Sequence, residues 1–121
     1  MFKLALAATA ALTLATPALA DDWDFILTNG TNKPIKKIEL APTGTTTWQD
    51  NKVDPEMKRE PTLANGKRMT VHFDKGPGCK YDVKATFADD SSSTWTGVNV
   101  CDSSFVTVKL NAAGVASFTA N

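Results

Sequence analysis

The sequence is poor in the side chains on which most enzyme active sites depend. Its 121 residues include one histidine, His72, and two cysteines, Cys79 and Cys101. Two cysteines and one histidine cannot fill the four positions of a zinc site without carboxylates, and a nucleophilic serine or cysteine needs a neighbouring base. The sequence also lacks a G-x-S-x-G elbow, a Walker loop, a dinucleotide-binding glycine pattern and an H-E-x-x-H motif. We therefore predict no catalytic residue, no metal site and no cofactor.

An excess of charge of either sign is also missing. The chain has 13 Lys and Arg residues against 13 Asp and Glu residues. Lys3 is the one charged residue among the first twenty, so a chain beginning at Asp21 has 12 basic and 13 acidic residues. Binding to nucleic acid or to anionic lipid needs a net basic surface. Neither partner is expected.

Long hydrophobic runs are absent, apart from a short one at the N-terminus. Residues 1–20 combine Lys3, a run rich in Leu and Ala, and Ala18-Leu19-Ala20 immediately before Asp21. This pattern is typical of a cleaved secretory signal peptide, and the run is too short and too rich in Ala and Thr to span a bilayer core of about 30 Å. No twin-arginine pair precedes it, which favours a general export route. We expect a signal peptide at 1–20, one domain at 21–121, a periplasmic or secreted location and no membrane span after cleavage.

The rest of the chain consists of short runs with strand-like composition, separated by turn residues. No stretch has the periodicity of an amphipathic helix, and such spacing of short strands is typical of a sandwich or small barrel. We predict an all-β fold, a single small antiparallel β-sandwich of about seven strands with one disulfide. The expected strands are 23–29, 35–41, 67–73, 80–87, 93–100, 104–110 and, more weakly, 115–120.

The two cysteines lie at the ends of a segment that should form a hairpin. If residues 88–92 turn about Asp90, Cys79 lies opposite Cys101 and Ala85 lies opposite Trp95. Opposed residues have Cα atoms about 4.5–5.5 Å apart, which is within the range of about 4.4–6.8 Å that a disulfide bridges. Closing this 23-residue loop would stabilise the fold by roughly 3 kcal/mol. A one-residue bulge would shift the register and remove the direct opposition.

The two faces of this hairpin differ in how clearly they can be assigned. In that register the odd-numbered residues form one face, on which Ala85 and Gly97 leave room for Trp95. The even-numbered face has no consistent character. It combines Lys80, Asp82, Lys84 and Thr86 with Val98 and Val100.

Residues 48–62 are charged, contain two prolines and have no clear period. We therefore expect a long surface connection there. Long loops in compact domains are often functional. Its candidate ligand or partner surface comprises Trp48, Asp50, Asp54, Glu56 and Glu60. Trp48 could be an exposed anchor for a partner or sugar, or it could plug the end of the sandwich. The acidic turn at Asp89-Asp90 could offer oxygens to calcium, although the calcium-loop pattern is missing and Asp is an ordinary turn former.

The order of motifs resembles a family of small exported bacterial proteins of uncharacterised function. The motifs are F-I-L-T-N-G-T at 25–31, I-K-K-I-E-L-A-P at 35–42, Trp48, L-A-N-G-K-R-M-T-V-H-F at 63–73, C-K-Y-D-V-K-A-T-F-A-D-D at 79–90 and W-T-G-V-N-V-C at 95–101. Some members carry labels such as "Tat pathway signal protein" or "argininosuccinate lyase". A lyase of that kind is a long helical chain, which cannot fit into the strand-rich residues 21–121. The resemblance implies a β-sandwich and no particular activity. The sequence departs from the pattern at Asp90-Ser91, where Asp-Gly is more usual, and in the charged segment 51–61.

These observations favour an exported, monomeric binding or accessory module without catalytic activity. Its partner would be an envelope protein or a small ligand. Two alternatives stay open: a hydrolase-like enzyme that uses the carboxylates near 48–60, and a structural protein stabilised by calcium.

Overall fold

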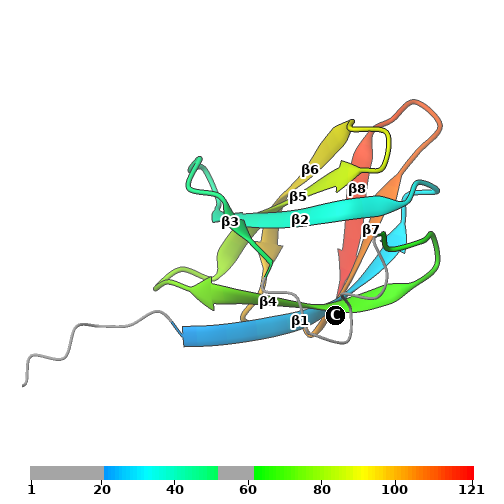
Figure 1. Ribbon diagram of the computed structural model, residues 1–121. Coiled ribbons are helices and arrows are strands. Elements are labelled where there is room, and N and C mark those ends of the chain that lie inside the picture. Colours follow the sequence, from blue (N-terminus) through cyan, green and yellow to red (C-terminus); the bar gives the residue numbers. More distant parts are fainter. Residues whose placement is uncertain (1–20, 52–61) are drawn as a thin grey trace, which may run out of the picture.

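The computed structural model describes residues 21–51 and 62–121, and these form an all-β sandwich (Figure 1). The predicted fold class is confirmed, and each predicted strand is present. There is an eighth strand, β3, because the start of the expected 48–62 connection pairs briefly with its neighbour. The strands are β1 (Asp21–Gly30), β2 (Ile35–Pro42), β3 (Gln49–Asp50), β4 (Arg68–Lys75), β5 (Lys80–Phe87), β6 (Ser92–Asn99), β7 (Phe105–Leu110) and β8 (Ala116–Ala120). The described part of the chain contains no helix suited to crossing a membrane.

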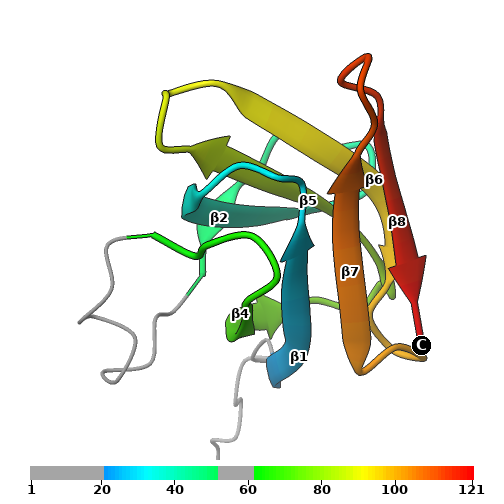
Figure 2. The same cartoon turned by 90° about the vertical axis from the view of Figure 1, so that its right-hand side faces the viewer.

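The strands form two sheets of four, in the orders β4-β1-β7-β8 and β3-β2-β5-β6. All neighbouring strands are antiparallel except β1 and β7, which run parallel side by side (Figure 2). The sandwich is thus antiparallel apart from this pair. Hydrophobic alternation determines which face of a strand is buried, but it does not determine which neighbour the strand pairs with or in which direction.

The core lies between the two sheets, and alternate residues of each strand point into it. Phe25 and Leu27 of β1 and Val71 and Phe73 of β4 are buried, while His72, on the opposite face of β4, is half-exposed. Phe73 lies edge-on to Phe25, with ring centroids 5.9 Å apart. It also contacts Tyr81 of the other sheet at 5.2 Å, so aromatic contacts worth about 0.5–1.5 kcal/mol each beyond burial join strands and layers.

The β5–β6 hairpin contains a bulge that the predicted register did not include. Ala85 lies opposite Ser93 rather than Trp95, and Trp95 lies opposite Val83. Between Val83 and Tyr81 the register shifts, so that Thr96 and Gly97 together oppose Asp82. The predicted opposition was therefore wrong for two reasons. The turn is centred on Asp89 rather than on Asp90, with the Phe87 N–H donating to the Ser91 carbonyl, and the bulge then inserts one extra residue into β6.

The bulge explains the mixed character of the even-numbered face. Trp95 points into the core, and the extra residue reverses the alternation beyond it. Val98 and Val100 therefore face the core as well, and both are buried. Gly97 has a φ of 76°, and its N–H donates to Oδ1 of the buried Asp82 at 3.1 Å.

The turn between β1 and β2 is built around Asn29, which is fully buried. Its Nδ2 donates to the carbonyls of Lys33 and Leu63 at 2.8 and 2.9 Å. Its Oδ1 accepts from the Thr31 N–H at 3.0 Å and from the Thr31 hydroxyl at 2.6 Å. One side chain thus joins the turn to the chain segment that enters β4.

Candidate functional site

The disulfide predicted from the sequence is present. The Cys79 and Cys101 sulfurs are bonded, and their Cα atoms are 5.3 Å apart. The Val100 N–H donates to the Cys79 carbonyl at 2.9 Å, so the bridge lies at the end of the β5–β6 ladder. It closes the hairpin beyond the bulge, with a contribution of about 3 kcal/mol in the chain-entropy model. Its role is structural.

The candidate surface begins at the four residues W-Q-D-N, 48–51, which alternate across the edge of the sandwich. Trp48 and Asp50 face outward, because Asp50 is exposed and the Trp48 ring lies by Lys84 on the outer face of β5. Gln49 and Asn51 point the other way, toward β4 of the opposite sheet. A strand period of two accounts for this division.

Gln49 and Asn51 hold this segment against the edge of β4. Gln49 donates through Nε2 to the Asp74 carbonyl at 2.9 Å and accepts from the Asp74 N–H through Oε1 at 2.8 Å. Asn51 Oδ1 accepts from the His72 N–H at 2.7 Å. The two amides pair with the backbone of the edge strand as another strand would, so they fix β3 across the gap between the sheets. We call these contacts the amide clamp.

One donor of the amide clamp lacks a partner. Asn51 is 7% exposed, and its Nδ2 is the one buried side-chain polar atom without a hydrogen bond in the described residues. A buried unpaired donor costs about 1–3 kcal/mol. The clamp thus combines three hydrogen bonds to β4 with one buried donor that has no protein partner.

The outer surface beside the clamp carries charges of alternating sign around Trp48. The Lys84 ammonium lies 5.6 Å from the centroid of the Trp48 ring. Lys37 lies 3.6 Å from the Asp50 carboxylate and 3.8 Å from the Glu39 carboxylate. We call this surface, made of Trp48, Asp50, Lys37, Glu39 and Lys84, the Trp48 face. It lies on β3, β2 and β5.

The chemistry available on the Trp48 face is that of recognition. Its carboxylates are paired with lysines at the surface, where such ion pairs contribute about 0–1 kcal/mol. Trp48 is half-buried on the outer face, and it is not part of the core cluster, so the alternative in which it plugs the sandwich does not describe its position. Of the predicted surface residues, Trp48 and Asp50 are brought together. Asp54, Glu56 and Glu60 lie outside the described residues.

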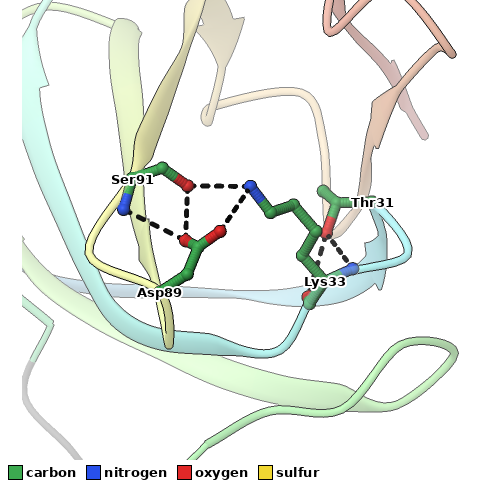
Figure 3. A network of polar contacts seen from close by, with 4 residues as sticks. All are labelled: Thr31, Lys33, Asp89 and Ser91. Atoms are coloured by element: carbon green, nitrogen blue, oxygen red, sulfur yellow. Dashed lines mark hydrogen bonds and ion pairs between the residues drawn. The ribbon is translucent and has the colours of Figure 1, made fainter.

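The acidic turn that could have offered oxygens to calcium is engaged with lysines from the neighbouring turn. Lys33 Nζ lies 3.1 Å from Asp89 Oδ2 and donates to Ser91 Oγ at 2.8 Å (Figure 3). Ser91 donates to Asp89 through its hydroxyl at 2.5 Å and through its N–H at 3.1 Å. The hydrogen bond from the Ser91 hydroxyl, then the one from Lys33, and then the one from the Ser91 N–H lower the pKa of Asp89 to about 2. Asp90 forms an ion pair with Lys36.

This network joins the β1–β2 and β5–β6 turns without gathering oxygen ligands around one point. Within residues 21–51 and 62–121, no three His, Cys, Asp or Glu side chains are placed to hold a metal ion. Lys33 and Lys36 place positive charge next to the carboxylates of Asp89 and Asp90, which favours their ionised form.

Sequence reasoning missed the residues that position Trp48. Gln49 and Asn51 were passed over because amides in a charged segment resemble loop residues. The alternation of W-Q-D-N could have indicated them, since a period of two separates them from Trp48 and Asp50. Lys84 was left without an assignment, and its contact with Trp48 depends on the fold rather than on sequence spacing.

Comparison with known proteins gives a fold relationship alone. No protein-family model matches the chain, and no curated protein matches it. One solved structure is similar, an NMR structure of a protein from Eubacterium rectale, with a TM-score of 0.53 and 19% sequence identity. The similarity covers 82% of this chain and 87% of the other. At that sequence identity the similarity indicates a related fold and does not indicate a function.

Proposed function

We propose that the chain is an exported, disulfide-stabilised binding module whose Trp48 face contacts an envelope protein or a small ligand. The observation that carries this proposal is the placement of Trp48. An aromatic ring lies half-exposed on a sheet surface, and the amide clamp holds the adjoining residues in place on a rigid scaffold. Aromatic side chains in preorganised positions are frequent energetic centres of interfaces.

The charges around Trp48 suit a partner with polar and charged groups. Lysines and carboxylates alternate there, so the surface presents no large field of one sign. Such a surface can pair with a complementary pattern and reject a wrong one, which gives specificity more than affinity. The partner would bury Trp48 and exchange ion pairs at the rim.

Export is part of the proposal and rests on residues 1–20. The described pairing of β1 with β4 begins at Asp21 opposite Lys75. Cleavage after Ala20 would therefore leave every strand of the sandwich intact. An exported location also favours the Cys79–Cys101 bond, since disulfides persist in oxidising compartments.

Binding can be tested with the oxidised 21–121 protein as bait for envelope extracts and for a panel of oligosaccharides. Any captured partner is then titrated against the wild type, Trp48→Ala and the control Phe105→Ala. Phe105 is an exposed aromatic residue on the other sheet, 48% exposed. We expect Trp48→Ala to weaken binding by about 2 kcal/mol, or some thirtyfold, and Phe105→Ala to leave it unchanged. Equal affinities of the wild type and Trp48→Ala would refute the assignment of this face.

Export and oxidation are tested separately by mass spectrometry of the protein isolated from its cell envelope. We expect a mass that begins at Asp21 and no alkylated cysteine without reductant. A retained leader together with two alkylated thiols would contradict the exported state, whatever the binding assay shows.

A further inference from the structure

The four edge strands of the sandwich differ in how they are protected against pairing with another chain. Native edges are blunted by shortness, bulges, charges, proline or covering groups. β3 is two residues long, β4 is covered by the amide clamp, and β6 contains the bulge at Thr96 and Gly97. β8 is the edge of its sheet, and its sequence A-S-F-T-A has no charge and no proline. Its pairing with β7 has no bulge.

The backbone of β8 presents alternate residues to its free side. Phe105 and Asn121 exchange two hydrogen bonds of 3.1 and 2.9 Å, so they form a hydrogen-bonded pair of the β7–β8 ladder. Such pairs alternate with non-hydrogen-bonded ones along an antiparallel ladder. In the register of β7 and β8, Ser117 and Thr119 are therefore bonded to β7. The N–H and C=O groups of Ala116, Phe118 and Ala120 point away from β7. β6 of the other sheet lies close to β8 but does not pair with it, and Figure 2 shows β8 as the outermost strand of its own sheet.

The sequence of β8 is close to a palindrome about Phe118. Read in either direction it gives Ala, a hydroxyl residue, Phe, a hydroxyl residue and Ala. An antiparallel pair of two such strands centred on Phe118 would oppose Ala116 to Ala120, Ser117 to Thr119 and Phe118 to itself. The residues with free backbone groups would then form hydrogen-bonded pairs, each exchanging two N–H···O bonds. The side-chain palindrome and the positions of the outward backbone groups therefore both favour the register centred on Phe118.

We propose that two copies of this chain pair through β8, antiparallel and with a two-fold axis at Phe118. The pairing would join two four-stranded sheets into one eight-stranded sheet. It would also cover the side chains of Ala116, Phe118 and Ala120, which are only partly buried at the edge. The contact is isologous, because each copy contributes the same surface. This differs from the monomer expected from the sequence.

The exposed apolar residues support a partner at this edge. Phe105 and Val115 are the exposed large hydrophobic residues of the described chain, at 48% and 59%. Phe105 pairs with Asn121, just beyond one end of β8, and Val115 precedes the other end. In the proposed register Val115 of one copy lies opposite Asn121 of the second copy, in the same row as Phe105. Val115 therefore extends the contact beyond the five residues of β8, and Phe105 lies one strand away in the same row.

Sedimentation equilibrium of the oxidised 21–121 protein tests the pairing. Two short strands bury less than a standard interface, so the dimer is weak and its mass depends on concentration. We expect the average mass to rise toward twice that of the chain as the concentration approaches about 1 mM. A single-chain mass over the whole range would overturn the proposal.

A matched pair of variants locates the contact. Ala120→Pro removes an outward N–H from each copy and no bond to β7, and proline is tolerated at such edge positions, whereas Ala120→Ser keeps the N–H. We expect the proline variant to dimerise at least about tenfold more weakly than the serine variant, with both retaining the sheet signal in circular dichroism. Equal dimerisation of the two folded variants would overturn the assignment to β8.

Cross-linking tests the register without proline. Ser117 and Thr119 are exposed, and in the proposed pair they oppose each other at about 4.5 Å between Cα atoms, a separation that a disulfide can bridge. Copies with Ser117→Cys mixed with copies with Thr119→Cys should form linked dimers faster than either variant alone, where the thiols are about 7–8 Å apart on the diagonal. No preference for the mixture would contradict this register.

Discussion

Replacing Gly97 by alanine tests the bulge that reverses the alternation of β6. Gly97 has a φ of 76°, and a Cβ added there would meet no heavy atom within 4 Å. Packing therefore contributes nothing to the effect of the substitution. What remains is the strain of a left-handed backbone in a residue with a side chain, about 1–2 kcal/mol. This strain is partly offset because alanine has less conformational freedom than glycine in the unfolded chain, which stabilises the folded protein by about 0.4–1 kcal/mol.

The net expectation is that Gly97→Ala lowers the free energy of unfolding by about 1 kcal/mol. Gly78 supplies a matched control, since a Cβ there also meets nothing within 4 Å and its φ is not positive. Gly78→Ala should have no strain and should stabilise slightly. The difference between the two variants isolates the backbone strain at about 1–2 kcal/mol.

The assay is urea unfolding with the disulfide intact, followed by intrinsic tryptophan fluorescence. A slope of about 1–3 kcal/mol per molar urea places the midpoints of the two variants roughly 0.5–1 M apart. Gly97→Asn should lie between Gly97→Ala and the wild type, because asparagine tolerates the left-handed region. Coincident midpoints for Gly97→Ala and Gly78→Ala would refute the argument that the bulge depends on this conformation.

Two further predictions concern the turns. Asn29→Ala should lower the free energy of unfolding by about 3 kcal/mol or more, because it removes the four hydrogen bonds that this buried side chain makes. Asn65→Ala, which removes one exposed hydrogen bond, should cost less than about 1 kcal/mol in the same urea assay, and equal losses would contradict this reading. The pKa of Asp89 in the folded protein is about 2, below the ordinary value of 3.8, so its contribution to stability is present above about pH 4 and is lost as the pH falls toward 2. Thermal unfolding between pH 4 and 2 should therefore decline less steeply in Asp89→Asn than in the wild type or in Asp102→Asn, and parallel declines would count against the Lys33–Asp89–Ser91 network.

The parts of the fold that could be predicted are those that depend on local sequence alone. The strands at 23–29 and 67–73 were predicted from their composition and turn boundaries, and a strand period of two puts Phe25 and Phe73 in the core. The two cysteines were paired correctly, since a chain with two cysteines has one possible internal pairing. Both inferences need only local sequence.

The parts that could not be predicted depend on contacts between distant segments. The parallel pairing of β1 with β7 follows from how the two sheets assemble, and no pattern in either strand specifies it. The bulge is similar, since Gly97 reverses the alternation only where Asp82 is present across the ladder to accept its N–H. The amide clamp is a third case, because Gln49 and Asn51 find their partners on β4 of the other sheet.

Most residues that carry the family resemblance have structural roles in this fold. Asn29 organises a turn, Asp82 and Gly97 hold the bulge, and Trp95 is buried in the core. A resemblance made of such residues implies a fold and leaves the activity open. Trp48 is the exception, because its ring lies on the outer face of the sheet and outside the core cluster. Since folding does not account for a tryptophan at that position, its presence there is the strongest reason to look for the partner on the Trp48 face.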